Sequence, residues 1–341
     1  MAFIPRHAYI PPESIPRSYF LGHHRSGLSK MTSMLAQIDL IIECRDYRVP
    51  LSSTNPMFER LLQGRKRLIV FTKRDVGSPF PPTLADKKRE ALLSSHFHPS
   101  TSLFTASTPK DTNRVLTLIR QHARDRQSLT GSRLLVVGMP NVGKSTLLNA
   151  LRAAGVHKGK AARTGAQPGI TRSIASSVKI VEPDERSGAG AVYLIDTPGV
   201  FVPFVPDPET MLKLSLVGCV KDGIVPLETC VDYLLYRMNL VDPEAYGAWC
   251  PPTNEIGVLL ENVAKRTGRL GKGATLDLEA AALWVLQKWR TGHMGKFVLD
   301  EVSEETLEER RKMDGAVSMN QAKKRGKEAL RQKSKSQNME E

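Results

Sequence analysis

The sequence has few cysteines, and they are widely spaced. Only four occur among its 341 residues, Cys44, Cys219, Cys230 and Cys250, and no two of them form a CxxC pair. A small secreted scaffold needs many cysteines, and a structural zinc site needs closely paired ones. The shortage therefore argues against both kinds of framework and favours a reducing compartment.

Long apolar runs and lipid-attachment signals are also missing. No apolar run approaches the roughly 20 residues that a helix needs to cross a bilayer. The sequence shows neither an N-terminal Met-Gly nor a C-terminal CaaX box, which are signals for common lipid anchors. We therefore expect no transmembrane segment and no lipid anchor.

Acidic residues are fewer than basic ones. The 35 Asp and Glu residues face 49 Lys and Arg residues, which gives a formal net charge of +14 and a pI near 9.7. Such an excess predicts a polyanionic partner, either nucleic acid or an anionic membrane surface. The alternative is a basic surface that serves solubility alone.

The first thirty positions hold a single acid, Glu13, beside the basic residues Arg6, Arg17, Arg25 and Lys30. This composition resembles an organellar transit peptide. Prolines in the same stretch, however, oppose the amphipathic helix that such a peptide forms. For residues 1–28, a transit segment and a plain basic arm both remain open.

The rest of the chain divides into two domains and a tail. Over residues 29–206, strand-like apolar runs alternate with helical stretches, which predicts an α/β domain with a mostly parallel sheet. Residues 207–300 contain helical stretches without a convincing strand, so we expect a smaller, all-helical domain. Residues 301–341 are charged and almost lack large apolar side chains, which predicts a disordered tail. The strands of the first domain are expected in DLIIECRD, RKRLIVFTKRD, TSLFTAS, RLLVV, SIASSVKIVEP and AVYLIDTPG.

A phosphate-binding loop is predicted by GMPNVGKS, residues 138–145, which fits GxxxxGK[ST] between an expected strand and an expected helix. In this motif, backbone N–H groups wrap the phosphates, Lys144 reaches the outer phosphates and Ser145 ligates Mg²⁺. The alternative is a glycine-rich turn with an exposed lysine. The residues expected to contact phosphate are Asn141, Val142, Gly143, Lys144, Ser145 and Thr146.

Two further segments complete a nucleotide switch. LIDTPG places Asp196 at a strand end, where it can hold Mg²⁺ through water, and Gly199 where its N–H can sense a γ-phosphate. GAQPGITRS, between the loop and that strand, contains Thr171, which can close on Mg²⁺ and the γ-phosphate. We therefore assign catalytic roles to Lys144, Thr171 and Gly199.

We assign recognition of the guanine base to TKRD, residues 72–75. Asp75 can accept hydrogen bonds from guanine N1–H and the exocyclic amine, neither of which adenine presents, while Lys73 lies along the base. FTAS, after the next expected strand, offers the Ala106 N–H to the guanine oxygen. Lysine and aspartate two positions apart are common on solvated surfaces, so the argument depends on both segments following strands.

The order of these motifs is reversed, because ordinary GTPases have the phosphate loop first. A parallel sheet does not depend on where its chain begins, and new termini in a surface loop leave the strand-end constellation intact. The sequence therefore predicts a circularly permuted P-loop GTPase domain. In this order the second switch segment leads directly into the helical domain, so loss of γ-phosphate could reorient that domain.

This motif order resembles the circularly permuted GTPases of the YlqF/RbgA type, including the mitochondrial ribosome-associated members. The resemblance covers about Phe20 to Phe297. It also rests on YFLGHHRSGLSKM, on CRDYRVPLSSTNP, which is similar to the family's Asp-Ala-Arg-x-Pro-Leu-Ser segment, and on LDLEAAALWVLQKWRTGHMGKF.

The resemblance implies a function. Members of this family bind and hydrolyse GTP with Mg²⁺ and act late in assembly of the large ribosomal subunit, so rRNA would be the polyanionic partner. A mitochondrial matrix location is implied, with the matrix face of the inner membrane as a site of peripheral association. The rival hypotheses are a nucleotide-independent RNA-binding scaffold and a membrane-peripheral signalling GTPase.

Some residues depart from the family pattern. Thr72 replaces the usual asparagine of the base motif, so we expect the tie between base loop and phosphate loop to be lost and nucleotide affinity to fall. Tyr47 replaces an alanine. Val200 stands where many GTPases have a glutamine, and valine cannot orient a water, so water positioning must come from elsewhere.

Two residues are candidates for that role. Asn141 matches a family asparagine linked to activation by K⁺, although loop geometry explains it equally well. His23 matches a family histidine implicated in hydrolysis, and a histidine can orient water near neutral pH. Packing of the arm or a contact with RNA is the alternative for His23.

Overall fold

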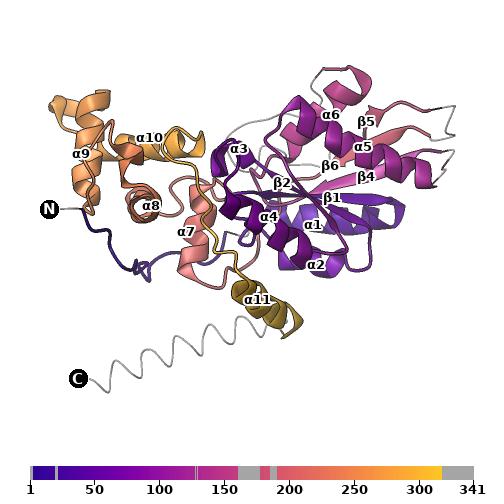
Figure 1. Cartoon of the computed structure of the whole chain (residues 1–341), viewed down its shortest axis with the longest axis horizontal. Coiled ribbons are helices and arrows are strands. Elements are labelled where there is room, and N and C mark those ends of the chain that lie inside the picture. Colours follow the sequence, from indigo (N-terminus) through magenta and orange to yellow (C-terminus); the bar gives the residue numbers. More distant parts are fainter. Residues whose placement is uncertain are drawn as a thin grey trace.

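The computed structural model describes residues 3–19, 22–126, 128, 130–159, 177–184 and 190–316. An α/β part and a bundle of helices lie side by side along the long axis of the molecule (Figure 1). The chain enters beside the bundle, passes through the α/β part and returns to the bundle.

The α/β part is built on a six-stranded sheet in the order β3-β2-β1-β4-β6-β5. All neighbouring strands are parallel except the edge pair β5 and β6, which is antiparallel. The predicted mostly parallel sheet is thus confirmed. The strands are β1 (Leu40–Asp46), β2 (Arg67–Thr72), β3 (Thr101–Phe104), β4 (Ser132–Val137), β5 (Val178–Val181) and β6 (Val192–Asp196).

Helices cover both faces of this sheet because successive strand residues point to opposite sides. On one face, Ile41 and Leu135 pack with α1 (Gly22–Met34) and α2 (Pro56–Leu61). On the other, Ile42 and Leu134 pack with α5 (Pro109–Arg126) and α6 (Lys144–Val156). Burial on two sides explains why the central strands read as continuous apolar runs. Two further helices follow β2, namely α3 (Arg74–Gly77) and α4 (Leu84–His96).

The second part contains α7 (Pro208–Leu216), α8 (Leu227–Val241), α9 (Ile256–Thr267) and α10 (Leu278–Arg290). Asp207 and Asp277 cap α7 and α10 by accepting hydrogen bonds from the N–H groups of Thr210 and Ala280. Over the described residues from 207 onward, the only β pairing is the isolated bridge between Leu270 and Leu276. No helix in the described ranges is both long and apolar enough to span a bilayer.

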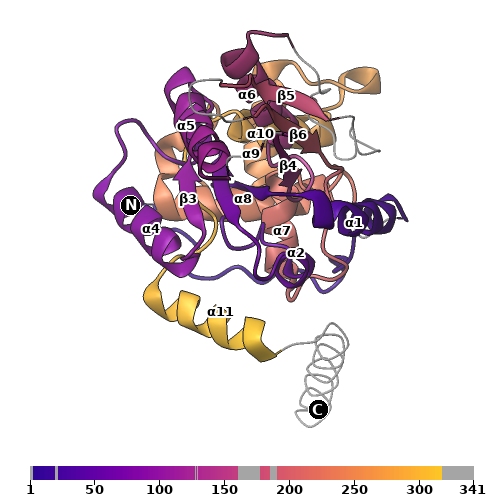
Figure 2. The ribbon, with the colours of Figure 1, turned by 90° about the vertical axis from the view of Figure 1, so that its right-hand side faces the viewer.

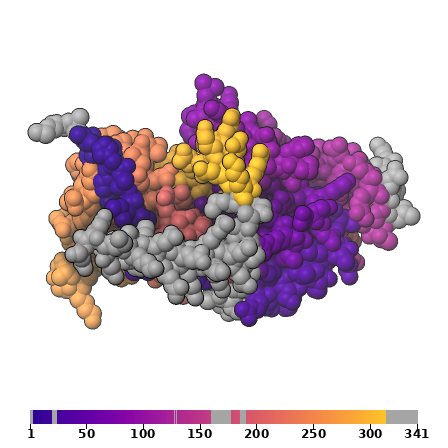
Figure 3. Space-filling view, turned by 90° about the horizontal axis from the view of Figure 1, so that it is seen from below, coloured from indigo at the N-terminus to yellow at the C-terminus, as the bar shows by residue number. Residues whose placement is uncertain are grey.

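The N-terminal segment is packed, although we expected an arm or transit segment over residues 1–28. Arg6 forms an ion pair with Asp232 of α8 at 2.8 Å, and the Tyr9 ring packs edge-on against Tyr233 at 5.2 Å. The segment runs across the helical part in Figure 3. One of these contacts comes from an aromatic residue, which a charge count ignores, and the other from a charged residue whose partner is 226 positions away in the chain. The last positions of the range belong to α1.

Residues 301–316, the described part of the expected tail, are partly helical and packed. Helix α11 (Glu304–Ala316) follows the bundle, and Leu307 is buried among Tyr47, Leu93 and Val298. The helix lies over the junction of the two parts (Figure 3), next to α4 in Figure 2. A single leucine, Leu307, provides the anchor, which is too little to register in the composition of a charged segment.

Candidate functional site

The phosphate loop joins β4 to α6, as the motif predicts, and its glycines are required by geometry. Gly138 has φ +147°, and a Cβ there would lie 2.4 Å from the Cys44 carbonyl oxygen. Gly143 has φ +87° and precedes α6. The loop therefore turns tightly over the N-terminus of a helix, where backbone N–H groups favour an anion.

Lys144 and Asp196 form the charged centre of this loop. The buried Lys144 Nζ donates to the Met139 carbonyl at 2.6 Å, so the lysine spans the loop. Burial lowers the pKa of the Lys144 ammonium, and the charge of Asp196 opposes that shift. Burial likewise raises the pKa of the Asp196 carboxyl, against Lys144 and a hydrogen bond from Ser145. The two charged groups therefore stabilise each other in a poorly solvated site.

The oxygens around Asp196 fit a magnesium ion. Ser145 Oγ donates to Asp196 Oδ2 at 2.8 Å, while Asp196 Oδ1 is buried and makes no hydrogen bond within the described part of the chain. That same part contains no cluster of three metal-binding His, Cys, Asp or Glu residues. Mg²⁺ is usually held by one or two protein oxygens together with substrate phosphates and water, so this small set suffices. Thr171, the other predicted ligand, lies outside the described residues.

The segment after Asp196 packs directly on the phosphate loop. A Cβ on Gly199 would lie 2.5 Å from Pro140 Cα, so only glycine fits there. Val200 N–H donates to the Gly138 carbonyl at 3.3 Å. The Val200 side chain is buried in the cluster that contains Met31 and Ile195, as its lack of a polar group allows.

A histidine reaches this segment, but it is not the one that the family pattern singled out. His24 is buried, and its Nδ1 lies 2.9 Å from the Gly199 carbonyl oxygen and 3.2 Å from the Phe201 nitrogen. It donates to the first or accepts from the second, depending on its tautomer. His23 occupies α1, and its side chain lies outside the described residues. Sequence reasoning missed His24 because only the neighbouring position matched the family motif.

The base loop is tied to the phosphate loop through Thr72. Its Oγ1 donates to the Val142 carbonyl at 2.6 Å and lies 3.2 Å from the Arg45 carbonyl oxygen. The expectation that threonine removes the tie between the loops is therefore wrong, because the hydroxyl supplies the donor that an amide would have supplied.

Lys73 makes a second tie between the loops. It has φ 58°, a left-handed conformation, and its Nζ donates to the Asn141 carbonyl at 2.5 Å. The Nζ also forms an ion pair with Asp46 at 3.0 Å. Asn141 Nδ2 in turn donates to the carbonyl of Gly218, just after α7, at 2.8 Å. The amide nitrogen of Asn141 thus contacts the helical part.

The other two residues predicted to contact the guanine base, Asp75 and Ala106, differ in how free they are to do so. Asp75 lies in the first turn of α3, is exposed, and makes no hydrogen bond or ion pair with the described residues. The Ala106 N–H donates to Asp111 Oδ2 at 2.9 Å, so a guanine oxygen would have to compete with that carboxylate. The two base loops are adjacent, because Arg74 N–H donates to the Thr105 carbonyl at 3.0 Å.

Comparison with known proteins agrees with this arrangement. A family model described as 50S ribosome-binding GTPase matches residues 133–232. The chain is 38% identical over 315 residues to Mitochondrial GTPase 1 of Schizosaccharomyces japonicus, covering 86% of this chain and 93% of that protein. It is 36% identical over 303 residues to Mitochondrial ribosome-associated GTPase 1 of Mus musculus, covering 83% and 89%.

A solved structure is similar over nearly its whole length. GNP-bound YlqF from T. maritima matches with a TM-score of 0.54 and 20% identity, covering 81% of this chain and 97% of that one. At this identity the likeness shows the fold. In this chain, the two segments predicted to contact the base follow β2 and β3, before the phosphate loop, and the helical part follows β6.

Proposed function

Because the chain belongs to the family of Mitochondrial GTPase 1 and Mitochondrial ribosome-associated GTPase 1, we propose that this GTPase assists assembly of the large subunit of the mitochondrial ribosome. The observation that carries the proposal is the contact between Asn141 in the phosphate loop and Gly218 in the helical part. A change at the phosphates can pass through this contact to the domain that we propose binds ribosomal RNA.

The chain's own residues give each part of the nucleotide a partner. The loop at residues 138–143 and Lys144 hold the phosphates, and Asp75 with Lys73 selects guanine. Ser145 and Asp196 would hold Mg²⁺, with Thr171 as a third proposed ligand. Bound there, the ion supplies charge neutralisation to the β- and γ-phosphates. The Gly199 N–H, placed against the loop, would sense the γ-phosphate.

Hydrolysis needs a substitute for the missing glutamine. The buried Val200 side chain offers no hydrogen bond to a water. We propose a monovalent cation, K⁺, beside the Asn141 side-chain oxygen as the source of additional charge stabilisation. Hydrolysis should therefore be faster in K⁺ than in Na⁺ at equal ionic strength, and equal rates would exclude the cation. His23 is proposed to position water.

The net charge of the chain supports the proposed partner, and the names of its relatives support the proposed compartment. The net charge of +14 suits rRNA, and both relatives named above are called mitochondrial. We propose the mitochondrial matrix, where mitochondrial ribosomes assemble, with peripheral contact to the inner membrane as an additional association. A nucleotide-independent RNA scaffold is the second candidate. The hydrogen bonds of Lys144 with the Met139 carbonyl and of Ser145 with Asp196 support a nucleotide site instead.

Single-turnover GTP hydrolysis, measured with and without purified mitochondrial large subunits, tests the proposal. We expect the subunits to accelerate hydrolysis by the wild-type protein and to leave a Lys144→Ala variant inactive. Co-sedimentation with subunits in GTP but not in GDP should accompany this. Stimulation by anionic vesicles in place of subunits would favour a membrane-peripheral GTPase.

A further inference from the structure

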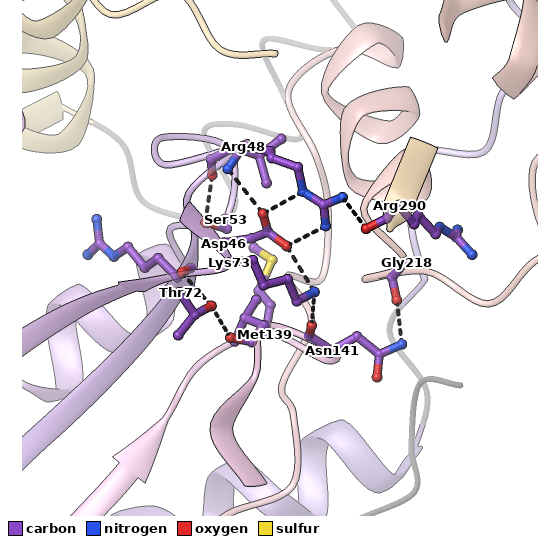
Figure 4. A network of polar contacts seen from close by, with 12 residues as sticks. Asp46, Arg48, Ser53, Thr72, Lys73, Met139, Asn141, Gly218 and Arg290 are labelled. Atoms are coloured by element: carbon purple, nitrogen blue, oxygen red, sulfur yellow. Dashed lines mark hydrogen bonds and ion pairs between the residues drawn. The ribbon is translucent and has the colours of Figure 1, made fainter. Parts of the chain in front are cut away.

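Asp46, the last residue of β1, is a buried anion with two cationic partners. Its carboxylate accepts from Arg48 Nε at 3.0 Å and Arg48 Nη2 at 2.9 Å, and it pairs with Lys73 Nζ at 3.0 Å (Figure 4). Burial alone would raise the pKa of this carboxyl, but the charges and hydrogen bonds of Arg48 and Lys73 hold the pKa well below its usual value. Asp46 therefore stays ionised throughout the neutral range.

The Lys73 ammonium is held by two acceptors from different segments. One is the Asn141 carbonyl of the phosphate loop at 2.5 Å, and the other is Asp46 at the end of β1. The lysine side chain is 30% exposed, and it belongs to the segment that we predict contacts the base. Asp46 thus limits the positions that the lysine can take next to the nucleotide.

Arg48, the other partner of Asp46, faces the helical part. Its Nη1 donates to the Arg290 carbonyl at the end of α10 at 3.4 Å, and its guanidinium lies 4.8 Å from the centre of the Trp289 ring. Leu299 N–H donates to the Arg48 carbonyl at 2.7 Å. The Arg48 side chain, which is only 1% exposed, therefore contacts both the end of β1 and the helical part.

Figure 4 shows a chain of contacts around the domain junction, which runs from Arg290 through Arg48, Asp46, Lys73 and Asn141 to Gly218. Two further contacts close this chain into a ring. The Arg290 side chain donates to the Leu216 carbonyl at 2.7 Å and the Ser215 carbonyl at 2.8 Å, in the last turn of α7. Gly218, after this turn, accepts from Asn141 at 2.8 Å. The ring passes through Lys73, Asn141, Gly218, the backbone from Gly218 back to Leu216, Arg290, Arg48 and Asp46. It therefore joins both predicted nucleotide loops to the C-terminal ends of α7 and α10.

We propose that Asp46 is a positioning residue for guanine-nucleotide binding, which fixes Lys73 beside the base and, through Arg48, links that position to the ends of α7 and α10. A base that packs along Lys73 strengthens one side of the ring. The change reaches the helical part through the ion pairs of Asp46 with Lys73 and Arg48, and then through the contacts of Arg48 with Arg290 and Trp289. This inference depends on nucleotide binding alone, so it does not depend on the ribosomal partner.

A double-mutant cycle tests the role of Asp46. Asp46→Asn should weaken both GDP and GTP binding by about tenfold in a fluorescent-nucleotide titration. In a Lys73→Met background the same substitution should change affinity by less than about twofold, because Asp46 acts through the lysine. Losses that multiply in the double variant would overturn the proposal, since they would show that Asp46 acts independently of Lys73.

Asp300→Asn is a matched control. Asp300 is also a buried carboxylate at the junction, and it accepts from the N–H groups of Leu51 and Ser52 at 2.8 and 2.7 Å. None of its described contacts reaches the base or phosphate loop. This variant should lower the thermal midpoint of the nucleotide-free protein and keep wild-type affinity. An affinity loss equal to that of Asp46→Asn would mean that junction stability, not positioning, controls binding.

A second measurement keeps Asp46 unchanged, in case its replacement prevents folding. The chain has three tryptophans, and replacing Trp249 and Trp284 by phenylalanine leaves Trp289, which contacts Arg48, as the reporter. We expect GDP to change Trp289 emission, and the change to vanish in Lys73→Met at saturating GDP. An emission that does not respond to bound GDP would overturn the link to the helical part.

Discussion

At the residue scale, the Thr72 hydroxyl provides one of the two side-chain ties between the base loop and the phosphate loop. Thr72 is buried, and its Oγ1 donates to the Val142 carbonyl. Thr72→Val keeps the shape and removes this donor, which leaves a buried carbonyl unpaired at a cost of about 1–3 kcal/mol. We predict that Thr72→Val weakens GDP binding about fivefold to tenfold, a change within that energy. Isothermal titration would measure it.

Thr72→Ser is the control for this prediction, because serine keeps the hydroxyl and should bind GDP nearly as well as the wild type. Equal GDP affinity in the valine and wild-type proteins would show that the hydroxyl does not support the site. Sequence reasoning treated Thr72 as the loss of an amide. It could not see that the shorter side chain still reaches Val142, because that depends on the approach of two loops 70 residues apart in the chain.

At the element scale, helix α11 is anchored by few apolar contacts. Leu307 is 5% exposed and packs on the cluster of Tyr47, Leu93 and Val298. Leu307→Ala removes most of this contact, so we predict that α11 detaches and that trypsin cleaves at Arg310 and Arg311 several times faster. Limited proteolysis followed by mass spectrometry would locate the cuts. Glu308→Ala, an exposed change in the same helix, should leave cleavage unchanged, and equal rates in both variants would contradict the anchor.

The elements also show what a sequence can predict. The strands and the phosphate loop were predictable because alternation, apolar runs and GxxxxGK[ST] are local signals. Helix α11 and the packed segment over residues 3–19 were not, because each depends on a few side chains that meet a distant surface. Asp46 was visible in CRDYRVPLSS, but its role depends on Arg48 and Lys73, which only the folded chain brings together.

At the scale of the whole molecule, the basic charge is the proposed link to RNA. The segment from 317 to 341 is rich in Lys and Arg, and a truncation after Ala316 leaves α11 complete. We predict that this truncation weakens binding to large subunits most at low salt. Each lost phosphate contact should reduce the slope of log affinity against log salt by about 0.7–0.9. GTP affinity should not change, and identical slopes would contradict an RNA contact.

The central claim is that a base loop placed first in the chain and a phosphate loop placed later form one guanine-nucleotide site. The most direct test is competition between GTP and xanthosine triphosphate for wild-type protein and for Asp75→Asn. The amide of asparagine offers a donor to the carbonyl that xanthine carries in place of the amino group. We predict that the wild type prefers GTP and that Asp75→Asn prefers xanthosine triphosphate. Unchanged GTP selectivity in Asp75→Asn would contradict the claim, because it would remove TKRD from the site.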